Sequence, residues 1–156
     1  MGMKSQKKYL KILKDYLFKF FNRDQIASSD LYYLLARFLR HSNQFAAVAK
    51  NVRTSAFLPH PSNLDLSVFG INHLSAIQIW TLSVKYLSSA KDKPIKGRAD
   101  IFAEDVNNIG LRLSRDNNPP RHANIIGWPE TKHEQKLIAA KLALKANLVL
   151  NPIVYP

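Results

Sequence analysis

The chain has 156 residues, of which 46% are hydrophobic and none is cysteine, and it carries a formal net charge of +12. This composition is typical of a globular protein and excludes a disordered chain, a disulfide framework and a thiolate metal site. The excess of 23 basic over 11 acidic residues predicts an anionic partner: a nucleic acid, a membrane surface or an acidic protein.

The positive charge is concentrated at the N-terminus. Residues 1–23 contain seven Lys or Arg and one acid, a net charge of +6. Aromatic and aliphatic residues recur between the lysines at helical spacing, which predicts an amphipathic helix over residues 5–22. We therefore divide the chain into a basic amphipathic helix, residues 1–23, and a single α+β domain, residues 24–156. The wide apolar stripe of this helix favours packing, so docking on a partner protein or self-association through residues 5–22 is one hypothesis for the chain.

A second helix is predicted after N-cap candidates at residues 28–30. Its inward positions are Leu31, Leu34, Leu35, Phe38 and Leu39. The pattern then changes, because residues 52–58 and 64–71 are β-like and flank the turn-rich segment 59–63. This arrangement predicts a hairpin or a strand pair with a wide loop.

Helices and short strands alternate in the rest of the chain. A helix over about residues 75–89 has an apolar stripe of Ile77, Trp80, Val84 and Leu87. A short helix over 104–109 ends at Gly110, and a capping box at Thr131 begins a last helix that runs to about Ala146. Strands are expected at 98–102, 111–113, 123–127 and 148–150. The order predicts an α+β or α/β layered domain in which two N-terminal helices precede a mixed sheet interleaved with helices.

The candidate site with the most defined chemistry begins at Arg121. In a strand, the period of two places His122 and Asn124 on one face. An imidazole beside an amide can act as general acid and base on a phosphodiester or nucleotide, with an arginine stabilising developing charge. Arg98 and Asp100 join this site if their strand pairs with it. The alternative is that His122 and Asn124 hydrogen-bond loop backbone at a strand entrance.

Motifs for metals, cofactors and membranes are absent from the sequence. The five histidines have no ligand spacing, and there is no glycine-rich phosphate loop, so we expect neither a metal nor a cofactor. Charged residues interrupt the N-terminal apolar stretch before any signal-peptide cleavage site. No stretch approaches the roughly 18 apolar residues of a membrane-spanning helix. We expect a cytoplasmic protein without an integral membrane segment.

The leading functional hypothesis is nucleic-acid binding. Arginines are interleaved with aromatic residues, a pattern that suits phosphate contacts and base stacking on RNA or single strands. No helix-turn-helix, zinc-finger or basic-zipper pattern is present, so reading of duplex sequence is not expected. The phosphate contacts are assigned to Lys7, Lys11, Lys14, Arg37, Arg40, Arg53, Arg112, Arg115 and Arg121.

Four short motifs also suggest a relationship. The segments 56–59 (AFLP), 66–69 (LSVF), 97–101 (GRADI) and 121–129 (RHANIIGWP) resemble a set of small prokaryotic proteins to which no activity is attached. The resemblance covers roughly residues 30–150. It implies a prokaryotic, cytoplasmic protein and assigns no cofactor or site residue.

Overall fold

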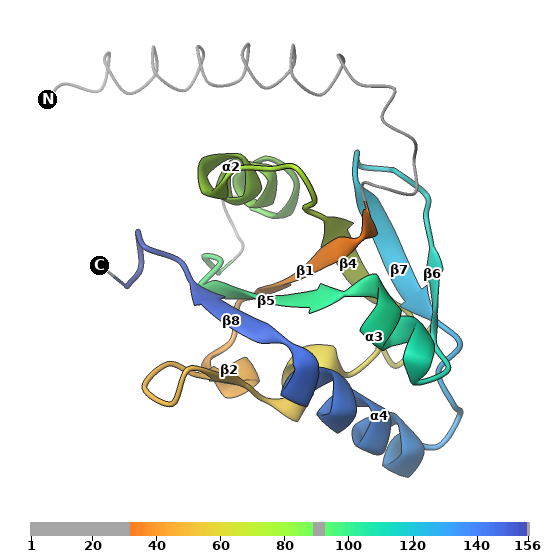
Figure 1. Ribbon diagram of the computed structural model, residues 1–156. Coiled ribbons are helices and arrows are strands. Elements are labelled where there is room, and N and C mark those ends of the chain that lie inside the picture. The colour runs from red at the N-terminus through yellow and green to blue at the C-terminus, as the bar shows by residue number, and fades with distance from the viewer. Residues whose placement is uncertain (1–31, 89–92, 156) are drawn as a thin grey trace, which may run out of the picture.

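The computed structural model describes residues 32–88 and 93–155, and one antiparallel sheet is its central element (Figure 1). The strand order is β6-β7-β4-β1-β5-β8, and every neighbouring pair is antiparallel. The strands are β1 (Leu34–Leu39), β4 (Leu66–Gly70), β5 (Gly97–Phe102), β6 (Arg112–Ser114), β7 (His122–Ile126) and β8 (Asn147–Leu150). The helix predicted over residues 5–22 and the boundary at residue 23 lie outside the described residues.

Helices lie on both sides of this sheet (Figure 1). On one side is α2 (Ala76–Leu87), and on the other are α3 (Ala103–Asn108) and α4 (Lys132–Lys145). Between β1 and β4 the chain forms two 3-10 turns, η2 (Ser42–Gln44) and η3 (Thr54–Phe57), and a small ribbon of β2 (Phe45–Ala46) and β3 (Asn51–Val52). The resulting α+β architecture confirms the predicted fold class, but the predicted mixed sheet is antiparallel throughout its described strands.

Each side of the sheet has its own core. The larger core packs alternate residues of the strands against η3 and α4, and its fully buried side chains include Leu35, Phe57 and Leu142. The smaller core packs Phe38 and Phe69 against α2. Side chains of opposite parity along one strand therefore enter different cores, as the period of two requires.

The predicted second helix is wrong, because residues 34–39 form β1 at the centre of the sheet. Leu35 and Leu39 enter the larger core, whereas Ala36 and Phe38 enter the smaller one. A strand buried on both faces shows no alternation of polar and apolar residues, so its sequence imitates the apolar run of a buried helix.

Elements bounded by clear end signals are confirmed. Ser75 caps α2 and Thr131 caps α4, each accepting a hydrogen bond from the backbone amide three residues later. Gly110 follows α3 with φ +88°, the left-handed conformation that its position after a helix requires. The strands expected within 64–71, 98–102, 111–113, 123–127 and 148–150 are present as β4 to β8, with shifts of one or two residues.

Two finer predictions fail. The strand expected at 52–58 is mostly the turn η3, and β3 pairs with β2 instead of with β4. In α2 the predicted Trp80 and Leu87 do pack against the smaller core, but Ile77 and Val84 are 71% and 55% exposed. The buried apolar positions are instead Ile79 and Leu82. Both stripes have helical spacing, so periodicity alone did not distinguish them.

Candidate active site

A row of polar side chains crosses β6, β7 and β4 on the face of the sheet that also carries α2. Ser114 is the register partner of Asn124, and Asn124 is the partner of Ser67. The core under α2 draws its side chains from β1, β4 and the segments around α2, and within the described ranges it includes none from β6 or β7. We call Ser114, Asn124 and Ser67 the polar row.

His122 connects this row to the neighbouring loop. Its Nε2 lies 2.7 Å from Oγ of Ser67, which is reached diagonally across the β7–β4 pair. The imidazole also packs edge-on against the ring of Phe69, its register partner, at a centroid distance of 5.3 Å. The strand pairing and this aromatic contact fix the imidazole against the Ser67 hydroxyl.

Asp116 holds the other side of the imidazole. Its Oδ1 lies 2.7 Å from Nδ1 of His122 and also accepts a bond from the backbone amide of Asn118. Burial opposes ionisation of this carboxyl, but the bonds from His122 and Asn118 outweigh that effect and hold the pKa of Asp116 below its ordinary value. An ionised Asp116 accepts the Nδ1 proton of His122, which leaves Nε2 as an acceptor for the hydroxyl proton of Ser67.

The loop between β6 and β7 places Asp116 by means of two unusual backbone conformations. Asn117 has φ +49° and Arg121 has φ +69°, both in the left-handed region. The side chain of Asn117 accepts a 2.7 Å bond from the backbone amide of Arg121, which closes the loop. The left-handed region is tolerated by asparagine but costly for arginine, so tertiary contacts must hold Arg121 there.

Arg121 supplies those contacts. Its Nη1 donates to the backbone oxygens of Gly70 and Asn72, at 3.2 and 2.9 Å, and only 6% of the residue is exposed. Its guanidinium therefore anchors the loop to the end of β4. The sequence analysis predicted that Arg121 lies beside the reacting group. In the structure its guanidinium is buried and holds the loop that carries Asp116.

Tyr32 stabilises the junction between this loop and β7. Its hydroxyl donates 3.1 Å to the backbone oxygen of His122, and the guanidinium of Arg115 lies 5.2 Å from its ring centre. Burial and the neighbouring Asp116 charge raise the pKa of Tyr32, against the opposing effect of Arg115 and Arg121. A neutral Tyr32 can therefore keep donating this bond over the ordinary pH range.

Asn124 completes the polar arrangement. It is opposite Ser67 in the register, so the two side chains leave the same face with Cβ atoms about 5 Å apart. Its carboxamide makes no hydrogen bond to any residue in the described part of the chain. An unengaged amide beside a hydroxyl can donate to an oxygen that becomes negative during a reaction.

Arg98 and Asp100 lie elsewhere. His122, Phe69, Ala36 and Asp100 form one register row across four strands, so about 14 Å separates the strand of His122 from that of Asp100. Arg98 donates to both carboxylate oxygens of Asp100 at 2.9 and 3.0 Å and stacks 5.0 Å from the ring of Trp80. Burial raises the pKa of Asp100, and the charge and hydrogen bond of Arg98 oppose that rise.

The residues predicted to contact phosphates are dispersed. Lys7, Lys11 and Lys14 lie outside the described residues, and Arg121 is buried. Arg53 is exposed beside η3, whereas Arg112 and Arg115 are exposed at β6 and in the loop after it. Arg37 lies within β1 and Arg40 directly follows it, and both are half-buried. The structure therefore brings Arg112 and Arg115, but not Arg53, to the side of the molecule that carries His122.

Sequence reasoning missed Ser67 and Asp116. Ser67 stands in a strand of otherwise apolar residues, and its position two residues from Phe69 places it on the face of His122 only once the β4–β7 register is known. No role was predicted for Asp116, which lies in the loop between β6 and β7. A carboxylate six residues before a histidine, across a loop with two prolines, was the one signal available for that contact.

The described residues contain no group of three His, Asp or Glu side chains that could hold a metal ion. Their helices are also too short or too polar for a bilayer crossing. Comparisons with protein-family models, curated proteins and solved structures found no match. The resemblance of four short motifs to small prokaryotic proteins stays a prediction.

Proposed function

We propose that the protein is a hydrolase of carboxylic esters in which Ser67 is the nucleophile, His122 the general base and Asp116 the group that orients His122. The observation that carries this proposal is the pair of 2.7 Å contacts that His122 makes with Ser67 and Asp116. A nucleophile, a base and an orienting acid in hydrogen-bonded sequence are the elements of serine-dependent acyl transfer on many unrelated folds.

The reaction follows from the positions of the protons. As Oγ of Ser67 attacks the ester carbonyl carbon, its proton passes to Nε2 of His122. That proton then goes to the leaving alcohol as the carbon–oxygen bond breaks, and an acyl-serine remains. Water attacks the acyl group, gives its proton to Nε2 and releases the acid, and the proton returns to Ser67. Asn124 is placed to donate to the carbonyl oxygen while it carries negative charge.

Acyl transfer fits this site better than the phosphodiester chemistry expected from the sequence. Phosphoryl transfer relies on cations at the reacting phosphate. The groups bonded to Ser67 Oγ and paired with it in register are an imidazole and a neutral amide. Arg98 and Arg121 are engaged elsewhere, and Arg37 bonds the backbone oxygen of Ser67 and not its hydroxyl. A phosphodiester is therefore the alternative substrate for the same three residues.

Covalent labelling tests the proposal without knowledge of the natural substrate. A fluorophosphonate probe should label the full chain on the peptide that contains Ser67, as read by mass spectrometry. Ser67→Ala should remove the label, and His122→Ala should slow labelling by roughly 10²-fold or more. Labelling of other serines, or equal rates for the wild type and His122→Ala, would reject the proposal. Hydrolysis of bis-p-nitrophenyl phosphate in preference to p-nitrophenyl acetate would assign the site to phosphodiesters.

A second candidate function, binding of single-stranded nucleic acid, rests on Arg112 and Arg115. Both are exposed beside the polar row, and Arg115 lies over the ring of Tyr32. Affinity for an RNA oligonucleotide, measured by fluorescence anisotropy, should fall steeply with salt, and Arg112→Ala should reduce the slope of log K against log salt by about one. Salt-independent binding, or none at low salt, would reject this function.

A further inference from the structure

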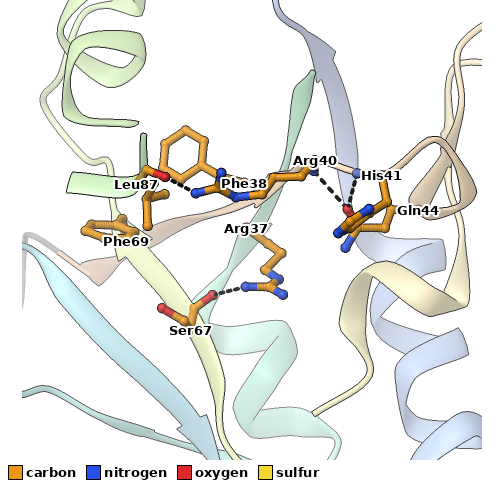
Figure 2. Close-up of a pocket in the computed structure, with 8 residues that line it drawn as sticks. All are labelled: Arg37, Phe38, Arg40, His41, Gln44, Ser67, Phe69 and Leu87. Carbon is orange, nitrogen blue, oxygen red and sulfur yellow. Dashed lines mark hydrogen bonds between the residues drawn. The ribbon is translucent and has the colours of Figure 1, made fainter. Parts of the chain in front are cut away.

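A small cavity lined by cationic side chains lies where β1 and β4 diverge (Figure 2). The registered pairing of these strands ends at Ala36 and Phe69, although β1 continues to Leu39. The cavity beyond that point has a volume of about 130 Å³, and its polar lining comes from Arg37, Arg40, His41, Gln44 and Ser67. None of the eight described residues that line it is acidic.

Arg37 supplies a positive charge that has no counter-ion among the described residues. Its Nε donates 3.2 Å to the backbone oxygen of Ala56 and its Nη1 donates 3.1 Å to that of Ser67, as Figure 2 shows for Ser67. No described carboxylate lies within ion-pair distance of this guanidinium. Burial, with a smaller contribution from the Arg40 charge, lowers the pKa of Arg37 to about 10. Arg37 is therefore still charged at neutral pH, and a bound anion would offset both effects.

Gln44 adds a hydrogen-bond donor of fixed orientation. Its Oε1 accepts from the backbone amides of Arg40 and His41, at 2.9 and 3.0 Å, which holds the carboxamide in place. Its Nε2 has no acceptor among the described residues and is not sealed from solvent. Arg40 crosses to the other side of the cavity, where its guanidinium donates to the backbone oxygens of Leu87 and Lys93.

We infer that this cavity binds the anionic group, a carboxylate or a phosphate, of the ester that is cleaved at Ser67. Two arginines, an imidazole and an amide donor are the groups that recognise oxyanions in a confined space. Ser67 connects the two sites, because its backbone oxygen faces Arg37 while its hydroxyl is bonded to His122 on β7. The assignment of the anion to a substrate rests on the proposed function, whereas the binding of an anion does not.

Gln44→Glu is the sharpest variant for this cavity. A glutamate oxygen can accept the same two backbone bonds, so the change replaces only the donating nitrogen with an oxygen and adds a negative charge. Gln78→Glu is the matched control, since Oε1 of Gln78 accepts the backbone amide of Ser75 at the start of α2 and lies outside both sites. Equal melting temperatures of the two variants would show that Gln44→Glu preserves the fold.

Isothermal titration of the full chain with inorganic phosphate, and in parallel with acetate, measures the anion site directly. The wild type and Gln78→Glu should bind one of these anions equally well, and Gln44→Glu should bind it at least about tenfold more weakly. Arg37→Lys should also bind more weakly, because lysine retains the charge but not the planar fork. Equal affinity of Gln44→Glu and the wild type, or no binding of either anion, would overturn the inference.

Ester hydrolysis then tests whether the anion belongs to the substrate. Gln44→Glu should lower kcat/KM for the p-nitrophenyl monoester of succinate about tenfold more than kcat/KM for p-nitrophenyl acetate, and Gln78→Glu should leave both values unchanged. Equal effects on both esters, with anion binding intact in the wild type, would remove the substrate assignment. Failure of fluorophosphonate labelling at Ser67 would instead reject the hydrolase itself, and the titrations would still report on the cavity.

Discussion

The hydroxyl of Ser67 lies 2.7 Å from Nε2 of His122, although 55 residues separate them in the chain. The contact exists because β4 and β7 are neighbours in the sheet and pair in a register that sets Phe69 opposite His122. A shift of one residue in that register would turn His122 or Ser67 to the opposite face, where the larger core lies. The candidate site is therefore a product of the register of the sheet.

Replacement of His122 by alanine separates catalysis from folding. The imidazole is partly exposed, with 13% of its side chain accessible, so we expect the melting temperature of His122→Ala to stay within about two degrees of the wild type. Hydrolysis of an ester substrate should fall by roughly 10²–10⁴-fold. His133→Ala, at an exposed position in α4, is the control and should retain full activity. A collapse of the melting temperature in His122→Ala would assign this histidine to the structure instead.

The carboxyl of Asp116 should make stability depend on pH in the acid range. Its pKa is lower in the folded protein than the ordinary value of about 3.9 expected in the unfolded chain. Its contribution is therefore complete above that value and is lost as the pH falls through the folded pKa. The wild type should melt at a higher temperature than Asp116→Asn at about pH 5, and this difference should shrink below about pH 4.

A double-mutant cycle attributes that effect to the imidazole. With His122→Ala in the background, Asp116→Asn should cost less than it does in the wild type, because the side-chain bond is already absent. The backbone bond from Asn118 remains in both backgrounds, so a residual effect is expected. Identical costs in the two backgrounds would contradict the bond between Asp116 and His122.

Arg121 offers a test of backbone conformation by two truncations. Arg121→Ala and Arg121→Gly both lose the guanidinium bonds to Gly70 and Asn72. At φ +69° alanine is strained and glycine is not, so Arg121→Gly should be the more stable of the two by about 1 kcal/mol in urea denaturation. An alanine variant as stable as the glycine variant would place this residue outside the left-handed region.

The sequence predicts individual helices and strands better than it predicts which of them lie side by side. Gly110 and Thr131 mark helix ends by short-range chemistry, and each of those ends is where the pattern indicates. By contrast, β1 serves two cores at once, and its apolar run has no period that distinguishes a buried strand from a helix. Local pattern predicted β4 to β8, but strand order and register depend on contacts between distant segments.

The candidate site also combines local relationships, which could be predicted, with tertiary contacts, which could not. His122 and Asn124 share a face because of the period of two within one strand, and this could be predicted. That Ser67 and Asp116 reach His122 from β4 and from a loop could not be predicted, since both contacts depend on the tertiary arrangement. The predicted meeting of His122 with Arg98 and Asp100 required β5 to pair with β7, whereas β4 and β1 lie between those strands.

The ion pair of Arg98 and Asp100 should affect stability and leave activity unchanged. Its side chains are 9% and 11% exposed, and Nη1 of Arg98 is buried without a hydrogen-bond partner in the described part of the chain. Asp100→Ala leaves the guanidinium charge unpaired under α2 and should destabilise the protein by about 3–5 kcal/mol. The double variant Arg98→Met with Asp100→Leu removes both charges and should recover most of that loss, since two apolar side chains need no partner beside Trp80 and Phe38.

Urea denaturation measures the stabilities, and Ser67 labelling of the double variant should match the wild type. A double variant that folds but labels slowly would return Arg98 and Asp100 to the active site.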